Sequence, residues 1–513
     1  MVFLSENKLV DIKWIIYWIK LKLTFAGYCP NRMVLYKREF LINIFFLILA
    51  NVLIKPYYIL VIEREFQNQA GTSAWGTYFT LFSLSMIPQI LLDFGMTSYV
   101  NRRIASHPAD VHLIWRQTIG IRPAMALVFL IVFLILSAAS GFLNTHPELI
   151  FWIALNQILV SGILFFRAYI SGLGYYRTDS LFSVSDKLLF IVFMMFSGIF
   201  FPVNQINSFL IIQCTSLLIP FLAALIWIVL KTNSGDHSIK FSFPFYILKE
   251  CLPYAGIFIL MVLFSRMEPV WIDLLHEDGA RQAGIYAAAY RLLDAANMMG
   301  FLFAGLLLPL FSNALAQKDQ NQSQSLFDLA WKIMTVSAVL IAVPLAFYHT
   351  YIMNRLYTDA REDVLYILIL NLIPLTINYL LSTLLTAANQ ARSMNRLFII
   401  SIIINGLGHV LFTPRYGALG AACTALITQG ITSILLTGFI FQQKIIVIHR
   451  QHLKVFLYSL ILTGTTGLAL QQVALPEEIE FITFIFITLV LSLITGLIPI
   501  RSIYHQMIRP HPM

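Results

Sequence analysis

Basic residues alternate along this chain in a way that sets its fold class. The sequence is cut into about fourteen apolar stretches of roughly 20 residues, the length at which a helix spans the hydrocarbon core of a bilayer. Lys and Arg fall mainly in every second gap, with about 25 on one side, about five on the other and about four inside the stretches. Because short loops rich in Lys and Arg stay in the cytoplasm, the alternation predicts a polytopic membrane protein with both termini there.

The predicted spans and the gaps between them can be placed by residue. The spans begin near Phe40, Ala74, Gly120, Leu149, Leu181, Ser208, Leu252, Gly284, Trp331, Val364, Leu397, Ala418, Val455 and Phe481. The basic gaps hold, among others, Arg102 with Arg103, Arg177 with Lys187, Lys318, and Arg392 with Arg396. The opposite gaps are acidic, with Glu63 and Glu65, Glu277 and Asp278, and Glu477, Glu478 and Glu480. We therefore place the acidic gaps outside the cytoplasm.

Composition excludes several classes of protein. The chain is 59% hydrophobic and only 12% charged, far from the balance of a soluble domain. Its net charge of +9 is spread over the predicted cytoplasmic loops, so we expect no nucleic-acid partner. No gap exceeds roughly 25 residues, too short for a separate domain. We find no metal-ligand spacing, phosphate loop or nucleophile elbow, and expect no enzyme, cofactor or metal.

An internal repeat divides the predicted bundle. Gly76-Thr77-Tyr78 and Gly284-Ile285-Tyr286 lie 208 residues apart, by 284 minus 76. Lys55 and Arg266 lie 211 apart, and Pro202 and Pro414 lie 212 apart, by the same subtraction. This nearly constant offset predicts two six-span lobes with the same orientation, related by an axis along the membrane normal. The alternative is chance recurrence of Pro and Gly-x-Tyr in a Tyr-rich membrane protein.

The repeat and the charge pattern give the expected domain organisation. We predict an all-α polytopic membrane protein of about fourteen transmembrane helices, with two parallel-repeat six-helix lobes plus two C-terminal helices. Residues 1–39 form a cytoplasmic basic segment, in which residues 11–25 are expected to form an interfacial amphipathic helix rather than a signal peptide. Residues 40–231 form the N-lobe, 232–251 a cytoplasmic linker, 252–442 the C-lobe, and 443–513 the last two spans with the tail.

Three sequence segments resemble a known superfamily. They are LLDFGMTSYVNRRIA from Leu91, AGIYAAAYRLLDAANMM from Ala283, and the stretch from Thr386 to Gly430. With the six-plus-six-plus-two layout over about residues 40 to 445, they resemble the multidrug/oligosaccharidyl-lipid/polysaccharide exporter superfamily. Within it, the chain looks like the flippases that move O-antigen or capsule repeat units. The resemblance implies a central cleft lined by the first and seventh spans.

Ionisable residues inside spans are costly and mark candidate sites. Lys55 on the first span, Arg266 on the seventh and Arg291 on the eighth lie at similar depth, and Arg167 lies nearer the cytoplasm. The resemblance would place Lys55 and Arg266 across the cleft from each other, where an anionic pyrophosphate head group suits them. The carboxylates Asp294, Glu268 and Asp93 are candidates for ion coupling or ion pairs. The alternative is that these charges only form structural pairs, such as Arg266 with Glu268 or Arg291 with Asp294.

The function implied by the resemblance is transport without bond chemistry. We expect a flippase that moves polyprenyl-pyrophosphate-linked oligosaccharide units across a bacterial inner membrane by alternating access. Its expected partners are the lipid-linked oligosaccharide, membrane lipids and the polysaccharide polymerase machinery of lipopolysaccharide or capsule assembly. Two rivals stay open: a cation-coupled multidrug exporter and a flippase of the cell-wall precursor lipid. A multidrug exporter needs buried carboxylates, which the sequence does not place inside the first span because Glu63 and Glu65 come at its end.

Overall fold

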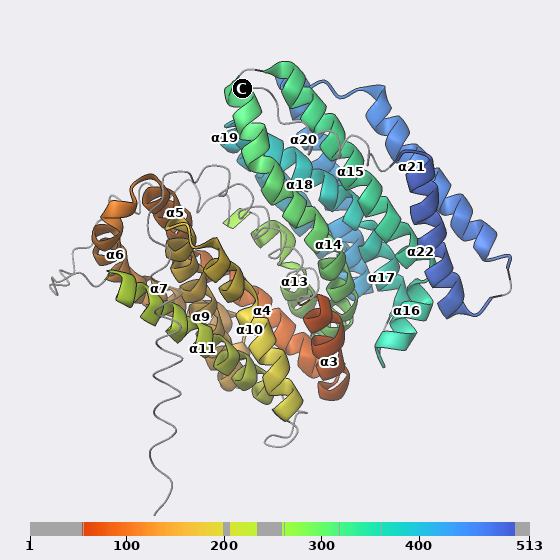
Figure 1. Ribbon diagram of the computed structural model, residues 1–513. Helices are drawn as coiled ribbons and strands as arrows, with labels where there is room; N and C mark the ends of the chain where they lie inside the picture. The colour runs from red at the N-terminus through yellow and green to blue at the C-terminus, as the bar shows by residue number, and fades with distance from the viewer. Residues whose placement is uncertain are drawn as a thin grey trace, which may run out of the picture. The chain divides into compact units, whose positions relative to one another are not determined.

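The computed structural model describes residues 54, 56–197, 206–232, 259–260, 262–317, 319–359, 361–473 and 475–497. Over these residues the regular structure is entirely helical, so the predicted all-α class is confirmed (Figure 1). The predicted interfacial helix, Lys55 and the C-terminal tail lie outside the described residues. The elements are the π-helix η1 (Tyr58–Glu63), the 3₁₀ turn η2 (Pro108–Asp110), and the helices α3 (Arg64–Ala70), α4 (Thr72–Asp93), α5 (Met96–Ser106), α6 (Val111–Ile119), α7 (Ile121–Ala139), α8 (Phe142–Thr145), α9 (Pro147–Gly172), α10 (Tyr176–Ser197), α11 (Ile206–Thr232), α13 (Glu268–Leu275), α14 (Gly279–Ala316), α15 (Gln320–Phe347), α16 (His349–Leu356), α17 (Glu362–Leu370), α18 (Leu372–Ala387), α19 (Ala391–Tyr416), α20 (Ala418–Gln443), α21 (Arg450–Leu470) and α22 (Glu477–Ile494).

Ten helical stretches in the described part of the chain are long and apolar enough to cross a membrane. Each coincides with one of the fourteen spans expected from the sequence. Some spans consist of two helices in series, as at residues 72–106, where α4 and α5 are separated by the left-handed residues Phe94 and Gly95. The protein is therefore a multi-pass membrane protein.

The other four expected spans divide into two kinds. The expected fifth and fourteenth spans correspond to α10 and α22, which are not among the ten; α10 carries Arg177, Asp179, Asp186 and Lys187, and α22 begins with three glutamates. The expected first and seventh spans begin in residues that the structure does not describe. The described helices therefore match twelve of the fourteen expected positions, and the first and seventh spans stay predictions.

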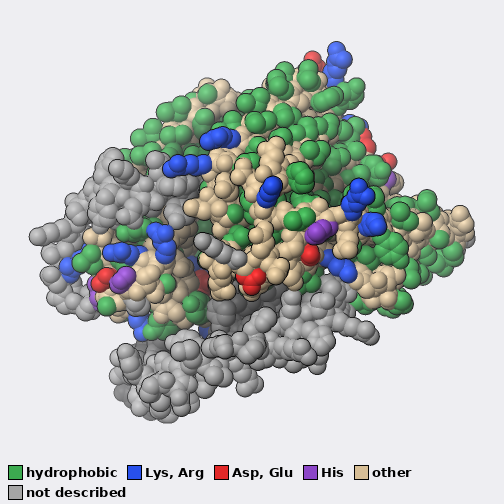
Figure 2. All heavy atoms as spheres, turned by 90° about the horizontal axis from the view of Figure 1, so that it is seen from above, with side chains coloured by type: hydrophobic (Ala, Val, Ile, Leu, Met, Phe, Trp, Pro, Cys, Tyr) green, Lys and Arg blue, Asp and Glu red, His purple; other side chains and the backbone are tan. Residues whose placement is uncertain are grey.

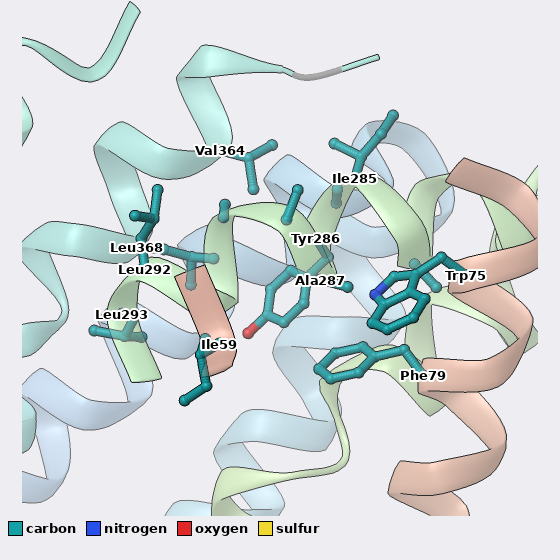
Figure 3. Close-up of a cluster of buried hydrophobic side chains, with 14 of the residues drawn as sticks. Ile59, Trp75, Phe79, Ile285, Tyr286, Ala287, Leu292, Leu293, Val364 and Leu368 are labelled. Atoms are coloured by element: carbon teal, nitrogen blue, oxygen red, sulfur yellow. The ribbon is translucent and has the colours of Figure 1, made fainter. Parts of the chain in front are cut away.

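Helices α4 and α14 form the principal contact between the two halves of the chain, here defined as the described residues up to 232 and from 259 to 443. Around it, α4 packs on α7 and α9, while α14 packs on α15, α17 and α18. Trp75 and Phe79 of α4 lie beside Tyr286 of α14 in one buried cluster that draws on both halves (Figure 3). This contact positions the charged residues of the candidate site.

The outward-facing sides of many helices are apolar. Large side chains such as Leu127 on α7, Leu411 on α19 and Phe486 on α22 are 58%, 68% and 67% exposed. A soluble protein rarely presents so much contiguous apolar surface, whereas lipid accommodates it without cost. On the face drawn in Figure 2, hydrophobic side chains cover wide areas and charged ones are scattered.

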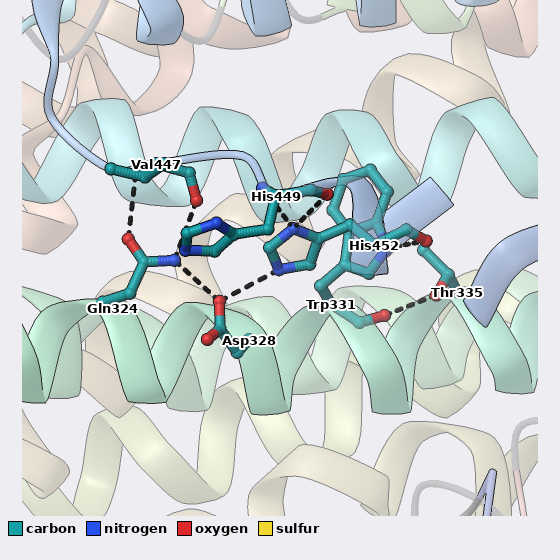
Figure 4. Close-up of polar contacts among 7 residues, drawn as sticks. All are labelled: Gln324, Asp328, Trp331, Thr335, Val447, His449 and His452. Atoms are coloured by element: carbon teal, nitrogen blue, oxygen red, sulfur yellow. Dashed lines mark hydrogen bonds and ion pairs between the residues drawn. The ribbon is translucent and has the colours of Figure 1, made fainter. Parts of the chain in front are cut away.

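A polar clamp joins the last pair of helices to the bundle (Figure 4). The Asp328 carboxylate on α15 lies 2.9 Å from Nε2 of His452 on α21, and Gln324 Nε2 donates to the same carboxylate oxygen at 2.7 Å. Gln324 also pairs with both backbone groups of Val447, and Trp331 Nε1 donates to the His452 carbonyl at 3.2 Å. These bonds fix the segment before α21 against α15.

Candidate functional site

A buried carboxylate ends the first described helical segment. Glu63 is the last residue of η1 and is only 4% exposed. The sequence placed it in a gap between spans on the outer side; the structure shows that its carboxylate faces the protein interior rather than solvent, and the membrane side stays a prediction. A π-helix inserts an extra residue per turn and rotates the residues that follow it, and such segments recur at functional sites.

The partner of Glu63 is Arg291. Its Nη1 lies 2.8 Å from Glu63 Oε2, and the two side chains are 12% and 5% exposed. The guanidinium also lies 5.7 Å from the Trp75 ring centroid and 5.2 Å from that of Phe79. This ion pair joins η1 in the first half of the chain to α14 in the second half, and it is enclosed by aromatic rings.

Arg266 has a looser environment. Its Nη2 lies 3.5 Å from Asp294 Oδ1, and its side chain is 33% exposed. The guanidinium lies 5.4 Å from the ring centroid of Tyr290. A contact of 3.5 Å is at the outer limit of a hydrogen bond, so the guanidinium retains donor capacity for a further anion.

Arg266 lines a small pocket between α4 and the segment of α13 and α14. The pocket is a partly open recess with about 150 Å³ of empty space, and its walls are formed by Phe79, Ser83, Ser265, Arg266, Glu268, Pro269, Tyr286 and Tyr290. Glu268 begins α13, is 5% exposed and has an oxygen, Oε2, without a hydrogen-bond partner among the described residues. A cation, a carboxylate, two hydroxyl-bearing rings and two serines therefore converge on one space.

Lys187 belongs near this site, although the charge pattern assigned it to a cytoplasmic gap. It lies in the middle of α10, and its Nζ is 4.5 Å from the ring centroid of Tyr58 in η1. Its Nζ also lies 3.4 Å from Asp186. The charge pattern grouped Lys187 with Arg177, which lies in the basic gap. The structure instead places Lys187 at the centre of the 22-residue helix α10.

The remaining sequence candidates lie in separate contacts. Arg167 on α9 forms a two-pronged pair with Asp179 on α10, with Nε at 2.7 Å and Nη2 at 3.3 Å from its oxygens. Asp93, at the end of α4, accepts from the Thr97 backbone at 3.1 Å and lies 3.6 Å from Arg122 Nη1. The sequence analysis did not single out Arg122, which also donates to the Ser161 carbonyl at 2.7 Å.

The pairing differs from the pairs considered from sequence. Those were Arg266 with Glu268 and Arg291 with Asp294, whereas the structure joins Arg266 to Asp294 and Arg291 to Glu63. Two carboxylates, Glu63 and Glu268, are buried beside the site. A lack of buried carboxylates therefore no longer counts against a cation-coupled multidrug exporter. Among the described residues, no group of three or more His, Cys, Asp or Glu side chains is placed to hold a metal ion.

Further contacts surround the site on the side of the acidic gap. Asn68 Nδ2 donates to the Leu356 carbonyl at 2.8 Å, and Gln67 Nε2 donates to the Gly284 carbonyl at 3.0 Å. Arg281 holds Asp359 in the loop after α16 at 3.0 and 3.1 Å. Hydrogen bonding to this guanidinium lowers the pKa of the Asp359 carboxyl below its usual value, so the pair stays charged at neutral pH.

Two family models match the chain. The model described as "Polysaccharide biosynthesis protein" matches residues 40–315, which is more than half of the sequence. The model described as "Lipid II flippase MurJ" matches residues 277–494. No curated protein matches.

Solved structures share the fold at low identity. One is an inward-facing multidrug resistance MATE family transporter of the MOP superfamily, with 14% identity, a TM-score of 0.56, and coverage of 82% of this chain and 96% of its own. A MOP superfamily transporter from Pyrococcus furiosus, whose title cites a reverse polarity of its binding pocket, has 13% identity, a TM-score of 0.55, and coverage of 79% and 94%. A MATE in complex with MaD5 has 16% identity, a TM-score of 0.55, and the same coverage. These likenesses show a common all-α transporter fold.

Proposed function

Because the chain belongs to the polysaccharide biosynthesis protein family of the MOP superfamily, we propose that it is a flippase for polyprenyl-pyrophosphate-linked oligosaccharide repeat units. Flippases and transporters of this superfamily move their cargo without making or breaking its bonds. The repeat unit is the cargo that fits best with the match over residues 40–315 and with a site that offers a cation to an anion.

The observation that carries the proposal is the environment of Arg266. Its side chain lines the pocket and is one-third exposed, and its ion pair with Asp294 is long, at 3.5 Å. A pyrophosphate oxygen can take donors that Asp294 does not use, and Arg binds such groups with two parallel hydrogen bonds. Ser83, Tyr286 and Tyr290 supply further donors around the same space.

The other cations take supporting roles in this proposal. Arg291 is held at 2.8 Å by Glu63 and is nearly buried, so we assign it to joining the two halves rather than to first contact with cargo. Arg167 donates two hydrogen bonds to Asp179, and we assign it to holding α9 against α10. Lys55 stays a prediction from sequence. Asp294, Glu268 and Asp93 are proposed to act as counter-ions, with Glu268 best placed to exchange a proton or cation with the pocket.

The size of the pocket indicates what transport requires. Sites for small molecules commonly enclose about 300–1,000 Å³. The pocket here has only about 150 Å³ of empty space even with the adjoining open solvent counted, too little for a pyrophosphate and its sugars. The two halves must therefore move apart to admit the head group, with the lipid tail left in the bilayer. Opening first toward one side and then toward the other is alternating access.

The proposed setting is a bacterial inner membrane with both termini in the cytoplasm. The supporting observation is the alternation of basic and acidic gaps, which orients helical membrane proteins. In this orientation the acidic residues before α14, Glu277 and Asp278, face outward. The proposed partners are the lipid-linked oligosaccharide and the polymerase that consumes it on the outer side.

A deletion strain tests this function. Removing the gene should abolish a surface glycan and accumulate its lipid-linked unit on the inner leaflet, and the intact chain should restore export. Undiminished export from a deletion strain without a redundant carrier would contradict the proposal. Loss of viability would favour the cell-wall precursor lipid as cargo, and cation-dependent resistance to dyes would favour a drug exporter, which the buried carboxylates Glu63 and Glu268 keep open.

A further inference from the structure

Two glycines allow α4 and α14 to touch backbone to backbone. A Cβ added to Gly76 would lie 1.8 Å from the Ala280 carbonyl oxygen and 2.6 Å from the Gly284 nitrogen. A Cβ added to Gly284 would lie 1.9 Å from the Thr72 carbonyl oxygen. No side chain can be accommodated at either position, so the close approach depends on both glycines.

The contact is symmetric about the predicted repeat. Ala280 follows Thr72 by 208 residues, and Gly284 follows Gly76 by the same number, from 280 minus 72 and 284 minus 76. Each helix thus presents the same two positions to the other. At these four positions the contact is made by small residues, so no long side chains interlock there, and the larger side chains that pack across the halves, such as Trp75 and Tyr286, lie beside it.

The glycine contact, formed by Thr72, Gly76, Ala280 and Gly284, lies at one end of the pocket. Phe79 is three residues past Gly76 and Tyr286 is two past Gly284, so the pocket begins about 3–5 Å further along both helices. A polar contact between the halves lies beside the pocket, where Thr80 Oγ1 donates to the Pro269 carbonyl at 3.3 Å.

We propose that the glycine contact is the gate that closes the outer side of the transport path and must open once in every cycle. The charge pattern places the start of α14 on the outer side, directly after Glu277 and Asp278. The Glu63–Arg291 pair and the bonds from Gln67 and Asn68 hold the gate shut. The inference rests on the proposed flippase for its cargo, but the gate is testable without any cargo.

Thiol accessibility measures the state of the gate. In a chain whose four native cysteines are replaced, Ser83→Cys reports on the pocket, since Ser83 is 3% exposed. Gly76→Ala or Gly284→Ala should speed its labelling by a membrane-impermeant reagent in intact cells by about tenfold or more, because the closed state is sterically blocked. The double variant should add little, because both substitutions break one contact.

Gly305→Ala is the matched control. Gly305 lies on the same helix, α14, and a Cβ there meets nothing within 4 Å, so labelling and transport should stay at the level of the parent. If Gly76→Ala and Gly284→Ala both fold well and leave the labelling rate of Ser83→Cys unchanged, the proposal that the glycine contact is a gate is wrong. Faster labelling together with no movement of the saccharide lipid by the parent chain would leave the gate in place and refute the proposed cargo.

Locking the gate gives an independent test that does not require the glycine variants to fold. Asn68 Oδ1 lies 3.4 Å from the Thr358 backbone nitrogen, so a short bifunctional thiol reagent can bridge Asn68→Cys and Thr358→Cys. Bridging should stop transport, reduction of a cleavable linker should restore it, and each single variant should be insensitive. Continued transport by the bridged protein would overturn the proposal.

Discussion

Arg266→Glu should abolish export of the surface glycan while the amount of protein in the membrane stays unchanged. The new carboxylate would stand beside Asp294 and Glu268 and repel an anionic head group from the pocket. Arg266→Lys keeps the charge but loses the fork of donors, so export should fall by about ten- to a hundredfold, the equivalent of about 1.5–3 kcal/mol for a hydrogen bond to a charged group. Surface glycan and membrane protein should be measured in the same cultures.

Arg167→Lys provides the control for that experiment. Arg167 is also an arginine inside a predicted span, but both of its prongs engage Asp179. Its replacement should lower the melting temperature of the purified protein more than it lowers transport per folded molecule. Normal export from a well-expressed Arg266→Glu variant would remove Arg266 from the cargo site.

Glu63→Ala should strongly destabilise the protein. It would leave the Arg291 guanidinium without its 2.8 Å partner in a site that is 12% exposed. Removing one partner of a buried ion pair typically costs about 3–5 kcal/mol, because the other charge is left uncompensated. Replacing both members, as Glu63→Gln with Arg291→Gln, should recover much of the loss, since no net charge then stays buried.

Glu65→Ala is the comparison for Glu63→Ala. Glu65 lies two residues further along and pairs with Arg64 at 3.1 Å, but its side chain is 54% exposed. Exposed pairs contribute little, so the melting temperature should hardly change. Thermal unfolding in detergent measures all four proteins, and equal melting temperatures for Glu63→Ala and Glu65→Ala would contradict a structural role for the Glu63–Arg291 pair.

The helices were predictable because hydropathy and loop charge depend on local sequence. Ten candidate spans fall where the sequence placed them, and α10 and α22 stand at two more of the expected positions. The exceptions are polar residues within helices. Lys187 lies mid-helix with its ammonium group over the Tyr58 ring, and local sequence could not predict this contact because the two residues are 129 positions apart, by 187 minus 58.

The site was predictable in its membership but not in its pairing. Depth along a helix follows from residue number, which brought Arg266, Arg291, Asp294 and Glu268 forward. Partner choice depends on how η1, α4 and α14 rotate against one another, and the Arg291 partner, Glu63, lies 228 residues away, by 291 minus 63. The π-helical turn of η1 that points Glu63 inward has no signal in the apolar pattern of Tyr58–Glu63.

The glycine pattern shows how a correct observation from sequence can miss its physical role. The sequence predicts that Gly76 and Gly284 are matching positions of a repeat, and the structure brings these two positions together between α4 and α14. The spacing alone could not predict that the backbones of the two helices touch at these glycines, because this contact depends on how the two halves pack together.

Reconstitution in vesicles tests the central claim most directly. Purified protein in liposomes that carry a fluorescent polyprenyl-pyrophosphate oligosaccharide should expose inner-leaflet lipid to an external glycan-cleaving enzyme, whereas empty liposomes should protect about half of it. The account predicts that the parent chain and Gly305→Ala make nearly all of the lipid accessible, and that Arg266→Glu behaves like empty liposomes. If about half of the lipid stays inaccessible to the enzyme in liposomes that contain the well-folded parent chain, with or without an ion gradient, the proposed flippase activity is contradicted.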